Sequence, residues 1–429
     1  MIYGLEDRLP IGTALLVSFQ QVVAMVVGTI TPTLILAGVL KFPPADTAYL
    51  ISAALFASAF GTFIQTKRRG IVGSGLLSVT GTSFAFLGPL MLAGQAGGLP
   101  LMFGLSLAAA PMQVVFAPFL PRLQRVFPPI VCGIVVLLIG LSLIPSGMYG
   151  IAAPAAPGAP AWAGLVIALV VLAVILSAQA TGRRWARLGS VPLGIVAGYA
   201  TCAACGWLQP AAPGDGSWIV LPRWLPHGLA FDAALLVPFA FIYLVSLLES
   251  LGDMTATAQL SGLPTSGADH WKRLRGGILA DGLTSVFAGL TGAFPSTTYA
   301  QNNGVIQITG VASRRIGPIM AAMLAALALF PPVGRWITAM PGAVLGALSL
   351  MLFGVVAVAG IRLIQRAGLS QRNVLITAFA LAAGLGLPSQ PELLKSLPHL
   401  LSTLLESGAS AGGITALALN LILPEDKEA

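Results

Sequence analysis

Long apolar segments separated by short charged loops run through the whole chain. A bilayer is crossed by about 20 residues of helix. Candidate spans of that length lie at 12–39, 47–65, two within 70–121, two within 126–182, 188–208, 232–259, two within 276–313, 316–334, 336–361, 373–390 and 407–423. Apolar residues are continuous over helical lengths and do not alternate, which favours a helical bundle over a β-barrel. The pattern predicts an all-α integral membrane protein with about 14 transmembrane segments.

Two of these segments are unusually polar for their position. One lies near 75–90 and contains TSFA at 82–85, and the other lies near 295–312 and contains TTYA at 297–300. Their glycine and hydroxyl content predicts broken, helix-poor segments. Polar groups at membrane depth are costly unless they face a cavity or a ligand. We therefore interpret both as walls of a binding site, in preference to hydroxyl-rich packing contacts between helices.

The order of the segments predicts an inverted repeat. About 14 spans divide into halves of about seven at the Pro/Gly-rich segment 209–232. An odd number per half makes the second half enter the membrane in the opposite sense, as in many secondary transporters. A trace of the repeat remains, because Gly28–Gly38 matches Gly252–Gly262 at five of eleven positions and TSFA resembles TTYA.

Composition and charge placement agree with this arrangement. The chain of 429 residues is 56% hydrophobic and 8% charged, with a mean hydropathy of +0.91, which excludes an ordinary soluble protein. Its net charge of +8 would suggest a nucleic-acid partner in a soluble protein, but here cations gather in the loops after even-numbered spans. Odd-numbered spans are followed only by Lys41, Arg223, Arg335 and Lys395. The positive-inside rule then predicts cytoplasmic termini and no nucleic-acid partner.

Three acidic residues lie well inside the predicted spans. Glu249 and Asp253 are four apart and share a helix face, and Asp281 follows in the next span. None has a cation in its span, so burial disfavours the ionised form. Such carboxyls could take up a proton with a substrate, or stay protonated and bond to neighbouring hydroxyls. We favour function for Glu249 as an intramembrane carboxyl, and both interpretations stay open for Asp253.

A carboxylate and a carboxamide together suit a flat heterocycle with adjacent N–H and C=O groups. Glu249 offers two acceptors, and Gln301 offers one acceptor and two donors. Phe84 could stack on the ring face. The residues alone therefore predict a proton-coupled carrier of a small polar solute that could be planar.

The chain resembles the nucleobase–ascorbate transporter family of uracil, xanthine and urate permeases. The most specific marker is QNNG at 301–304 followed by Thr309, and the spacing of the three intramembrane acids also fits the family. Uracil permeases tend to have Glu at position 301, so Gln there is similar to the xanthine and urate carriers. Gln21 departs from the pattern, since many relatives have His at this position.

The resemblance implies a division into a core domain that moves against a gate domain. The core would comprise residues 1–125 and 228–334, and the gate would comprise residues 126–210 and 335–429. Short strands in the third and tenth spans would hold the substrate. A homodimer through the gate domain, in the bacterial inner membrane, is also implied.

The resemblance also implies roles for individual residues. Direct binding of the base falls to Glu249, Gln301, Phe84, Ser83, Ala300 and Tyr299. Proton coupling falls to Glu249, Asp281 and Asp253. Supporting roles fall to Asn302, Gln21 and Thr298.

The function expected is proton-coupled uptake of xanthine, uric acid or both by alternating access, with no cofactor or metal beyond the proton gradient. One alternative is a uracil–proton symporter. A second is an inorganic-anion carrier of related fold, which predicts basic residues near the binding segments, and none lies between positions 276 and 313. A third is a membrane-embedded enzyme, which no His–acid cluster or nucleophile motif supports.

Overall fold

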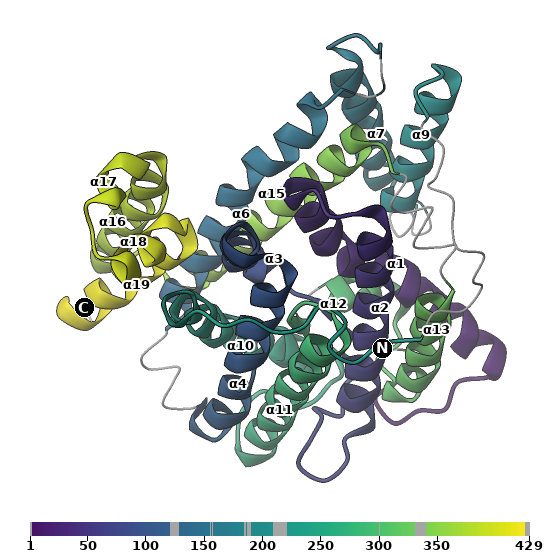
Figure 1. Cartoon of the computed structure of the whole chain (residues 1–429). Coiled ribbons are helices and arrows are strands. Elements are labelled where there is room, and N and C mark those ends of the chain that lie inside the picture. Colours follow the sequence, from purple (N-terminus) through teal and green to yellow (C-terminus); the bar gives the residue numbers. More distant parts are fainter. Residues whose placement is uncertain are drawn as a thin grey trace.

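Helices dominate the structure, a computed structural model that describes residues 2–120, 128–154, 156, 158–183, 186, 190–208, 221–299, 301–330 and 340–424. Figure 1 shows the helices as a bundle in which α16 to α19 gather at one edge. Their bounds are α1 (Ile11–Leu40), α2 (Pro44–Lys67), α3 (Leu87–Ala109), α4 (Pro111–Phe116), α6 (Pro129–Ala152), α7 (Ala163–Ala180), α9 (Ser190–Ala204), α10 (Ala233–Leu260), α11 (Ala268–Thr291), α12 (Gln301–Thr309), α13 (Gly317–Leu329), α15 (Gly342–Ala367), α16 (Gln371–Gly386), α17 (Pro391–Lys395), α18 (His399–Glu406) and α19 (Gly408–Ile422).

Many of these helices have membrane-spanning length. Within the described residues, eight helices are long and apolar enough to cross a bilayer, and the shorter helices α9 and α19 are apolar as well. A helix satisfies its own backbone hydrogen bonds, so it can lie in hydrocarbon without exposing polar backbone groups. The prediction of a helical, multi-pass membrane protein is confirmed, while the total number of spans stays a prediction.

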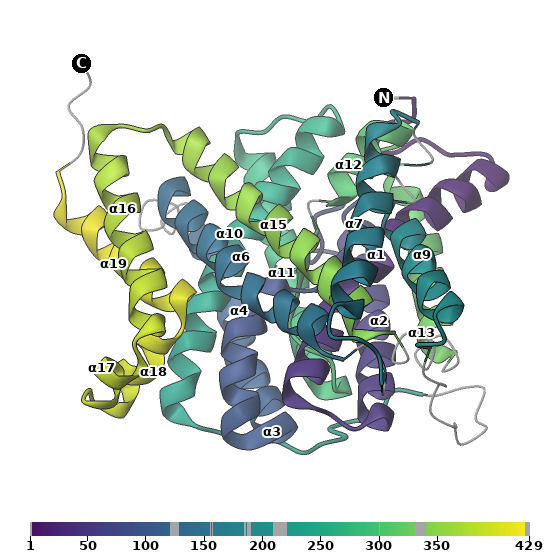
Figure 2. The same cartoon turned by 90° about the horizontal axis from the view of Figure 1, so that it is seen from above.

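Two sets of helices can be distinguished by their packing. In the first set, α2 contacts α1, α11 and α13, and α10 contacts α3, α4 and α11; in the second, α6 contacts α7, α15, α16 and α19. The contact between α6 and α15 is close (Figure 2). A Cβ atom added at Gly140 would lie 2.5 Å from the backbone nitrogen of Ala357, and one added at Gly133 would lie 2.8 Å from that of Ile364. Small residues allow such close approach of helices in membranes.

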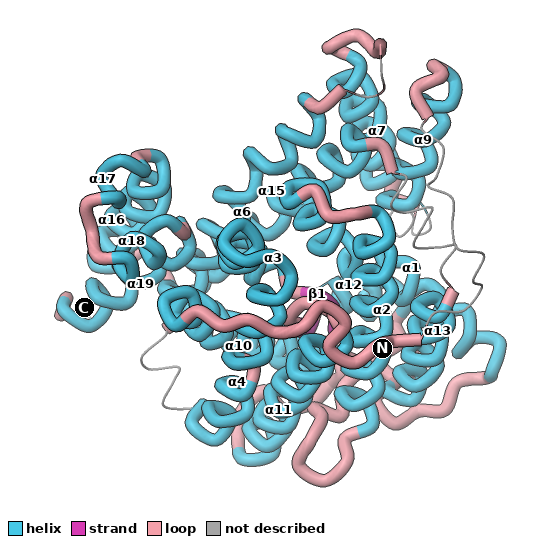
Figure 3. Tube along the Cα trace, viewed as in Figure 1, coloured by secondary structure: helices cyan, strands magenta, loops and turns pink. Residues whose placement is uncertain are grey.

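The two polar segments form the one strand pair in the part of the chain that the structure describes. Strand β1 (Thr80–Thr82), labelled and drawn in magenta in Figure 3, pairs antiparallel with β2 (Ser296–Thr298). Gly81 lies opposite Thr297. All residues of both strands are buried. The pairing satisfies backbone groups that could not stay open at membrane depth. The prediction that both segments break the helical pattern is confirmed.

Gly81 is required by the space around β1. A Cβ atom at this position would lie 2.6 Å from Thr29 Oγ1 and 2.7 Å from both Cζ and Oη of Tyr299. Such distances are far inside van der Waals contact, so any side chain here would displace the tyrosine ring. The glycine therefore sets how closely β1 approaches α1 and the end of β2.

Several segments predicted as loops are helical. The cations Lys272, Arg273 and Arg275 were expected before a span beginning at 276, but α11 already begins at Ala268. His270 and His399, which lie between predicted spans, are likewise helical, in α11 and α18. Helices α17 and α18 further occupy a region expected to be a loop. The prediction was wrong because charge was taken to end a helix, whereas a helix can continue past the bilayer into water.

The N-terminal segment docks beside the end of α12. Tyr3 forms a parallel bridge with Val311 and accepts a hydrogen bond at its carbonyl from Ala312 N–H at 3.0 Å. An ion pair of 2.7 Å joins Glu6 Oε1 to Arg314 Nε. These contacts hold the first residues and the 310–315 segment on the same side of the molecule.

Candidate functional site

A cavity of about 590 Å³ lies where the strand pair faces α6 and α15. This volume falls in the range of small-molecule sites, about 300–1,000 Å³. Its lining residues are Phe84, Ala85, Val136, Ile139, Glu249, Thr297, Thr298, Tyr299, Met351, Gly354, Val355, Val356, Val358 and Arg362. The first helix set and the strands supply the polar wall, and α6 and α15 supply a largely apolar one.

Glu249 is the acidic residue of this cavity. It lies in the middle of α10 and is half-buried, with its neighbour Ser250 fully buried. No ion pair of Glu249 occurs within the described residues. Phe84 closes one side and meets Phe353 edge-on, with ring centroids 6.4 Å apart. The cavity thus combines a carboxyl with an aromatic ring, as the sequence predicted.

Tyr299 is held in place at the end of β2. Its hydroxyl donates a 2.7 Å hydrogen bond to the Thr82 carbonyl of β1. The adjacent Thr298 hydroxyl is buried and has no hydrogen-bond partner among the described residues, and the same is true of Ser83. Thr298 and Tyr299 line the cavity, and Ser83 does not, although it directly precedes Phe84. Free hydroxyls at this point can bond to a bound molecule.

Asp281 lies behind the cavity in a complete hydrogen-bond network. Gln65 Nε2 donates to Asp281 Oδ1 at 2.8 Å, and Ser250 Oγ donates to Asp281 Oδ2 at 2.6 Å. Ser250 Oγ is also 2.8 Å from Thr297 Oγ1, and Thr297 lines the cavity. A chain of hydrogen bonds through the Ser250 and Thr297 hydroxyls therefore connects Asp281 to the cavity wall.

Asp253 lies one helical turn after Glu249 and outside the cavity lining. Its backbone carbonyl accepts from Asn303 Nδ2 at 3.4 Å, and Thr257 Oγ1 donates to Asn303 Oδ1 at 2.6 Å. Asp253 Oδ2 is buried without a partner among the described residues. These contacts attach α12 to α10.

Asn302 attaches the other side of α12, because its Nδ2 donates to the Leu77 carbonyl at 2.5 Å. Gln21 is fully buried in α1 away from the cavity lining, and neither of its amide atoms has a partner among the described residues. Ala300 lies outside the described residues. Gln301 begins α12, but its side chain is also outside the described part of the structure. The predicted contacts of both with a substrate stay predictions.

The sequence did not place three residues of the site. Gln65 was not recognised because amide residues also occur elsewhere in the spans, and Ser250 was one of the hydroxyls near the acids but was not paired with Asp281. Arg362 was assigned to a cytoplasmic loop, yet it lies in α15 and lines the cavity. A signal did exist, since Met351, Val355, Val358 and Arg362 recur at helical spacing and share one face.

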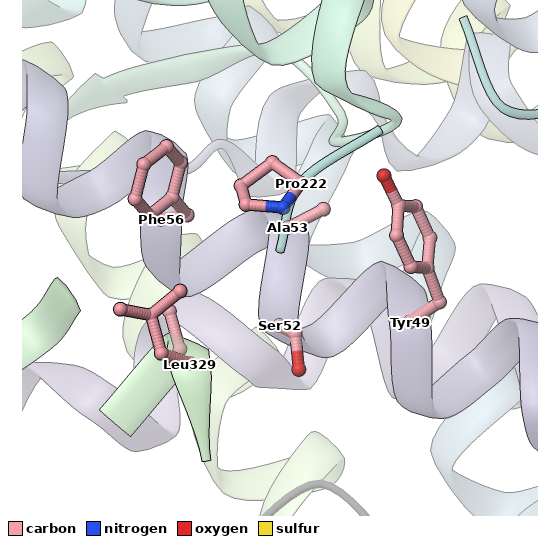
Figure 4. Close-up of a pocket in the computed structure, with 7 residues that line it drawn as sticks. Tyr49, Ser52, Ala53, Phe56, Pro222 and Leu329 are labelled. Atoms are coloured by element: carbon pink, nitrogen blue, oxygen red, sulfur yellow. The ribbon is translucent and has the colours of Figure 1, made fainter. Parts of the chain in front are cut away.

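Two smaller hollows lie elsewhere in the described part of the structure. One beside Tyr49 and Pro222 has a volume of about 10 Å³ (Figure 4), room for about one water molecule. The loop next to it stacks His227 on Phe103, and burial lowers the pKa of His227, opposed by nearby Asp46. The other hollow, of about 240 Å³, adjoins the main cavity. No group of three or more potential metal ligands occurs in the described ranges.

Comparison with known proteins decides the family. Residues 12–393 match the sequence model of the permease family Xan_ur_permease. The chain belongs to the xanthine/uracil permease family. This permease is accordingly a transporter and not an enzyme, and the predicted family resemblance is confirmed.

Relatives match the permease over its full length. Xanthine permease XanP of Escherichia coli (strain K12) is 41% identical, with 100% of this chain and 96% of that protein covered. Xanthine permease XanQ of the same strain is 40% identical, covering 99% and 94%. A purine permease of Emericella nidulans is 30% identical, covering 99% and 84%.

Solved structures of other transporters share the fold. The transmembrane domain of a cyanobacterium bicarbonate transporter, BicA, superimposes with a TM-score of 0.62 at 14% identity, covering 87% of this chain and 95% of that one. The murine anion transporter Slc26a9 in the inward-facing state gives 0.66 at 13% identity, covering 97% and 69%. At these identities the likeness concerns the fold alone. The permease therefore has the fold of these transporters.

Proposed function

We propose that this permease takes up xanthine, uric acid or both together with protons. The observation that carries the proposal is the cavity in which the Glu249 carboxyl, the Phe84 ring and the paired strands meet. A carboxyl and strand-edge hydroxyls can bond to the N–H and C=O groups of a purine dione, and an aromatic ring can stack on its face. The names and full-length similarity of the xanthine permeases support the same substrate class. Gln301 would complete the recognition by offering both a donor and an acceptor.

The transport cycle would move a core domain, residues 1–125 and 228–334, against a gate domain, residues 126–210 and 335–429. The two packing sets of helices support this division, because the cavity lies between them with Glu249 on one side and α15 on the other. The docking of Tyr3 beside Val311 supports an even number of crossings between these two points. We propose about 14 spans in all, cytoplasmic termini, a location in the bacterial inner membrane and a homodimer through the gate domain.

Uptake of a labelled nucleobase panel by cells that express the permease tests the function. We expect accumulation of xanthine, uric acid or both, collapse of that accumulation with a protonophore, and little competition by excess uracil. Cells carrying the empty vector are the control. Uptake of uracil alone would establish the pyrimidine alternative, and protonophore-insensitive accumulation would overturn proton coupling.

An inorganic-anion carrier is a second candidate, because Arg362 brings a cation to the cavity and the fold is shared with anion transporters. Labelled bicarbonate and chloride in the same uptake assay distinguish the two functions. Saturable transport of either anion, without purine uptake, would favour this candidate.

Arg362→Gln is expected to weaken transport of urate, the anionic form of uric acid, more than transport of neutral xanthine. Arg362 lines the cavity but its side chain is exposed, so its attraction for an anion is screened by water. A loss of about two- to fivefold in kcat/KM for urate is the size expected of an exposed ion pair. Arg366→Gln, one turn further along α15 and outside the cavity lining, is the matched control. Equal losses for both substrates would contradict an electrostatic role.

A further inference from the structure

The hydrogen bonds around Asp281 leave one carboxyl oxygen as the site for a proton. Asp281 is fully buried, and Gln65 Nε2 donates to its Oδ1 at 2.8 Å and to the Gly277 carbonyl at 2.9 Å. The Gln65 amide cannot be reversed, because its Oε1 accepts from the Ser74 backbone N–H at 3.1 Å, and that group can only donate. Oδ1 therefore always faces a donor. The Thr298 backbone N–H also donates to this carboxyl and cannot accept. Among these partners only the Ser250 hydroxyl can accept a hydrogen bond, so a proton taken up by Asp281 belongs on Oδ2, the oxygen that faces Ser250.

Ser250 connects that oxygen to the cavity. Its hydroxyl lies 2.6 Å from Asp281 Oδ2 and 2.8 Å from Thr297 Oγ1. A hydroxyl has one hydrogen to donate. When Asp281 is ionised, Ser250 must give its hydrogen to the carboxylate, so Thr297 donates to Ser250 and presents only lone pairs to the cavity. When Oδ2 is protonated, it donates to Ser250, Ser250 donates to Thr297, and the Thr297 hydrogen is free to point into the cavity.

We propose that Asp281, Ser250 and Thr297 form a hydrogen-bond switch, in which protonation of Asp281 changes Thr297 from an acceptor to a donor toward the substrate. The inference rests on the proposed function and deepens it, since it names how a proton behind the cavity is linked to binding within it. Once bound, the proton remains on Asp281 and is not passed on to the cavity. Only the directions of the hydrogen bonds that join Asp281, Ser250 and Thr297 reverse. A purine dione that presents a carbonyl oxygen to Thr297 then binds the protonated state more tightly. By linkage, the bound dione makes Asp281 hold its proton more tightly to the same extent.

Other titratable groups near Asp281 must be separated from this effect. Helix α10 contributes Glu249 and Asp253, which both interact electrostatically with Asp281. The other elements against it present uncharged groups, with Gln65 from α2, the Thr298 backbone from β2, and Gln113 and Val114 of α4 beside Gly282. Replacing Ser250 breaks the switch and leaves all three carboxyls in place.

Ser250→Ala in the full-length purified permease is the test, with xanthine affinity measured from pH 5.5 to 8 and proton uptake on binding measured in weak buffer. The wild type is expected to bind more tightly as the pH falls. In Ser250→Ala, the ratio of the xanthine affinity at pH 5.5 to that at pH 8 should fall by about 2- to 12-fold, which corresponds to the free energy of one neutral hydrogen bond. Ser246→Ala is the matched control, because Ser246 is fully buried one turn earlier on α10 and its hydroxyl has no partner among the described residues.

The pattern across variants separates the switch from simple packing. Ser250→Thr keeps the hydroxyl and should retain the pH dependence, whereas a packing role predicts one lowered affinity at every pH. If Ser250→Ala does not fold, Thr297→Val breaks the last link without touching Asp281 and should give the same flattened profile. A pH dependence equal to that of Ser246→Ala would overturn the switch. Absence of xanthine binding in the wild type would instead overturn the proposed function.

Discussion

Glu249→Gln is expected to abolish purine accumulation driven by a pH gradient while leaving exchange of purine across the membrane. Glu249 is half-buried in the cavity wall and has no ion pair within the described residues. A carboxamide keeps the shape and one acceptor but cannot bind and release a proton. With one proton per substrate, a difference of one pH unit supports about a tenfold accumulation. In the variant, the steady-state ratio should fall to about 1.

The measurement is accumulation of labelled xanthine in proteoliposomes with an imposed pH gradient, together with counterflow exchange without one. Glu392→Gln is the matched control, since Glu392 is exposed in the first turn of α17 and lines neither this cavity nor the adjoining hollow. Wild-type accumulation in Glu249→Gln would remove this carboxyl from proton coupling. Loss of counterflow as well would assign it to binding alone.

Gly81→Ala is expected to reduce purine binding severely. The new methyl group would lie within 2.7 Å of both Thr29 and Tyr299, so the Tyr299 ring must leave its position against the cavity. Overpacking of this kind costs about 1–3 kcal/mol. If that cost falls on the bound state, affinity for xanthine should drop by about 5- to 150-fold. Isothermal calorimetry on the purified permease measures the change.

Gly304→Ala provides the comparison for Gly81→Ala. It lies in α12, and a Cβ atom there meets nothing within 4 Å. Affinity in this variant should stay at the wild-type value, and stability should rise slightly because alanine favours helix. Wild-type affinity in Gly81→Ala would mean that the strand pair can shift without disturbing the site.

The strand pair shows which features of the site could be predicted from the sequence and which could not. Glycine and hydroxyl residues at membrane depth predicted two broken segments, and their polarity predicted that both are walls of a binding site. The register that places Gly81 opposite Thr297 could not be predicted, because it depends on how closely α1 and Tyr299 approach β1. Glu249, Phe84 and Tyr299 were predicted for the site and do line the cavity.

The missed residues have a common physical cause. Charged residues were assigned to loops. This assignment holds for Arg68 and Arg69 but not for Arg362, because a water-filled cavity can also hold a charged side chain at membrane depth. Gln65 lies near the end of α2, and only the folded structure brings it to Asp281, 216 residues later. Pairwise contacts of this range have no local sequence pattern.

The docked N-terminus has a consequence for how the permease is made. The Ser313 hydroxyl donates a hydrogen bond to the Asp7 backbone carbonyl, although Ser313 follows Asp7 by 306 positions in the chain. At roughly 5–20 residues per second, the ribosome needs about 15–60 s to synthesise the intervening chain. The first residues therefore leave the ribosome long before their partners are made. The contacts between the N-terminal segment and residues 310–315 form only after most of the helices have been synthesised. A protein fused to the N-terminus would therefore lie next to this late-forming contact.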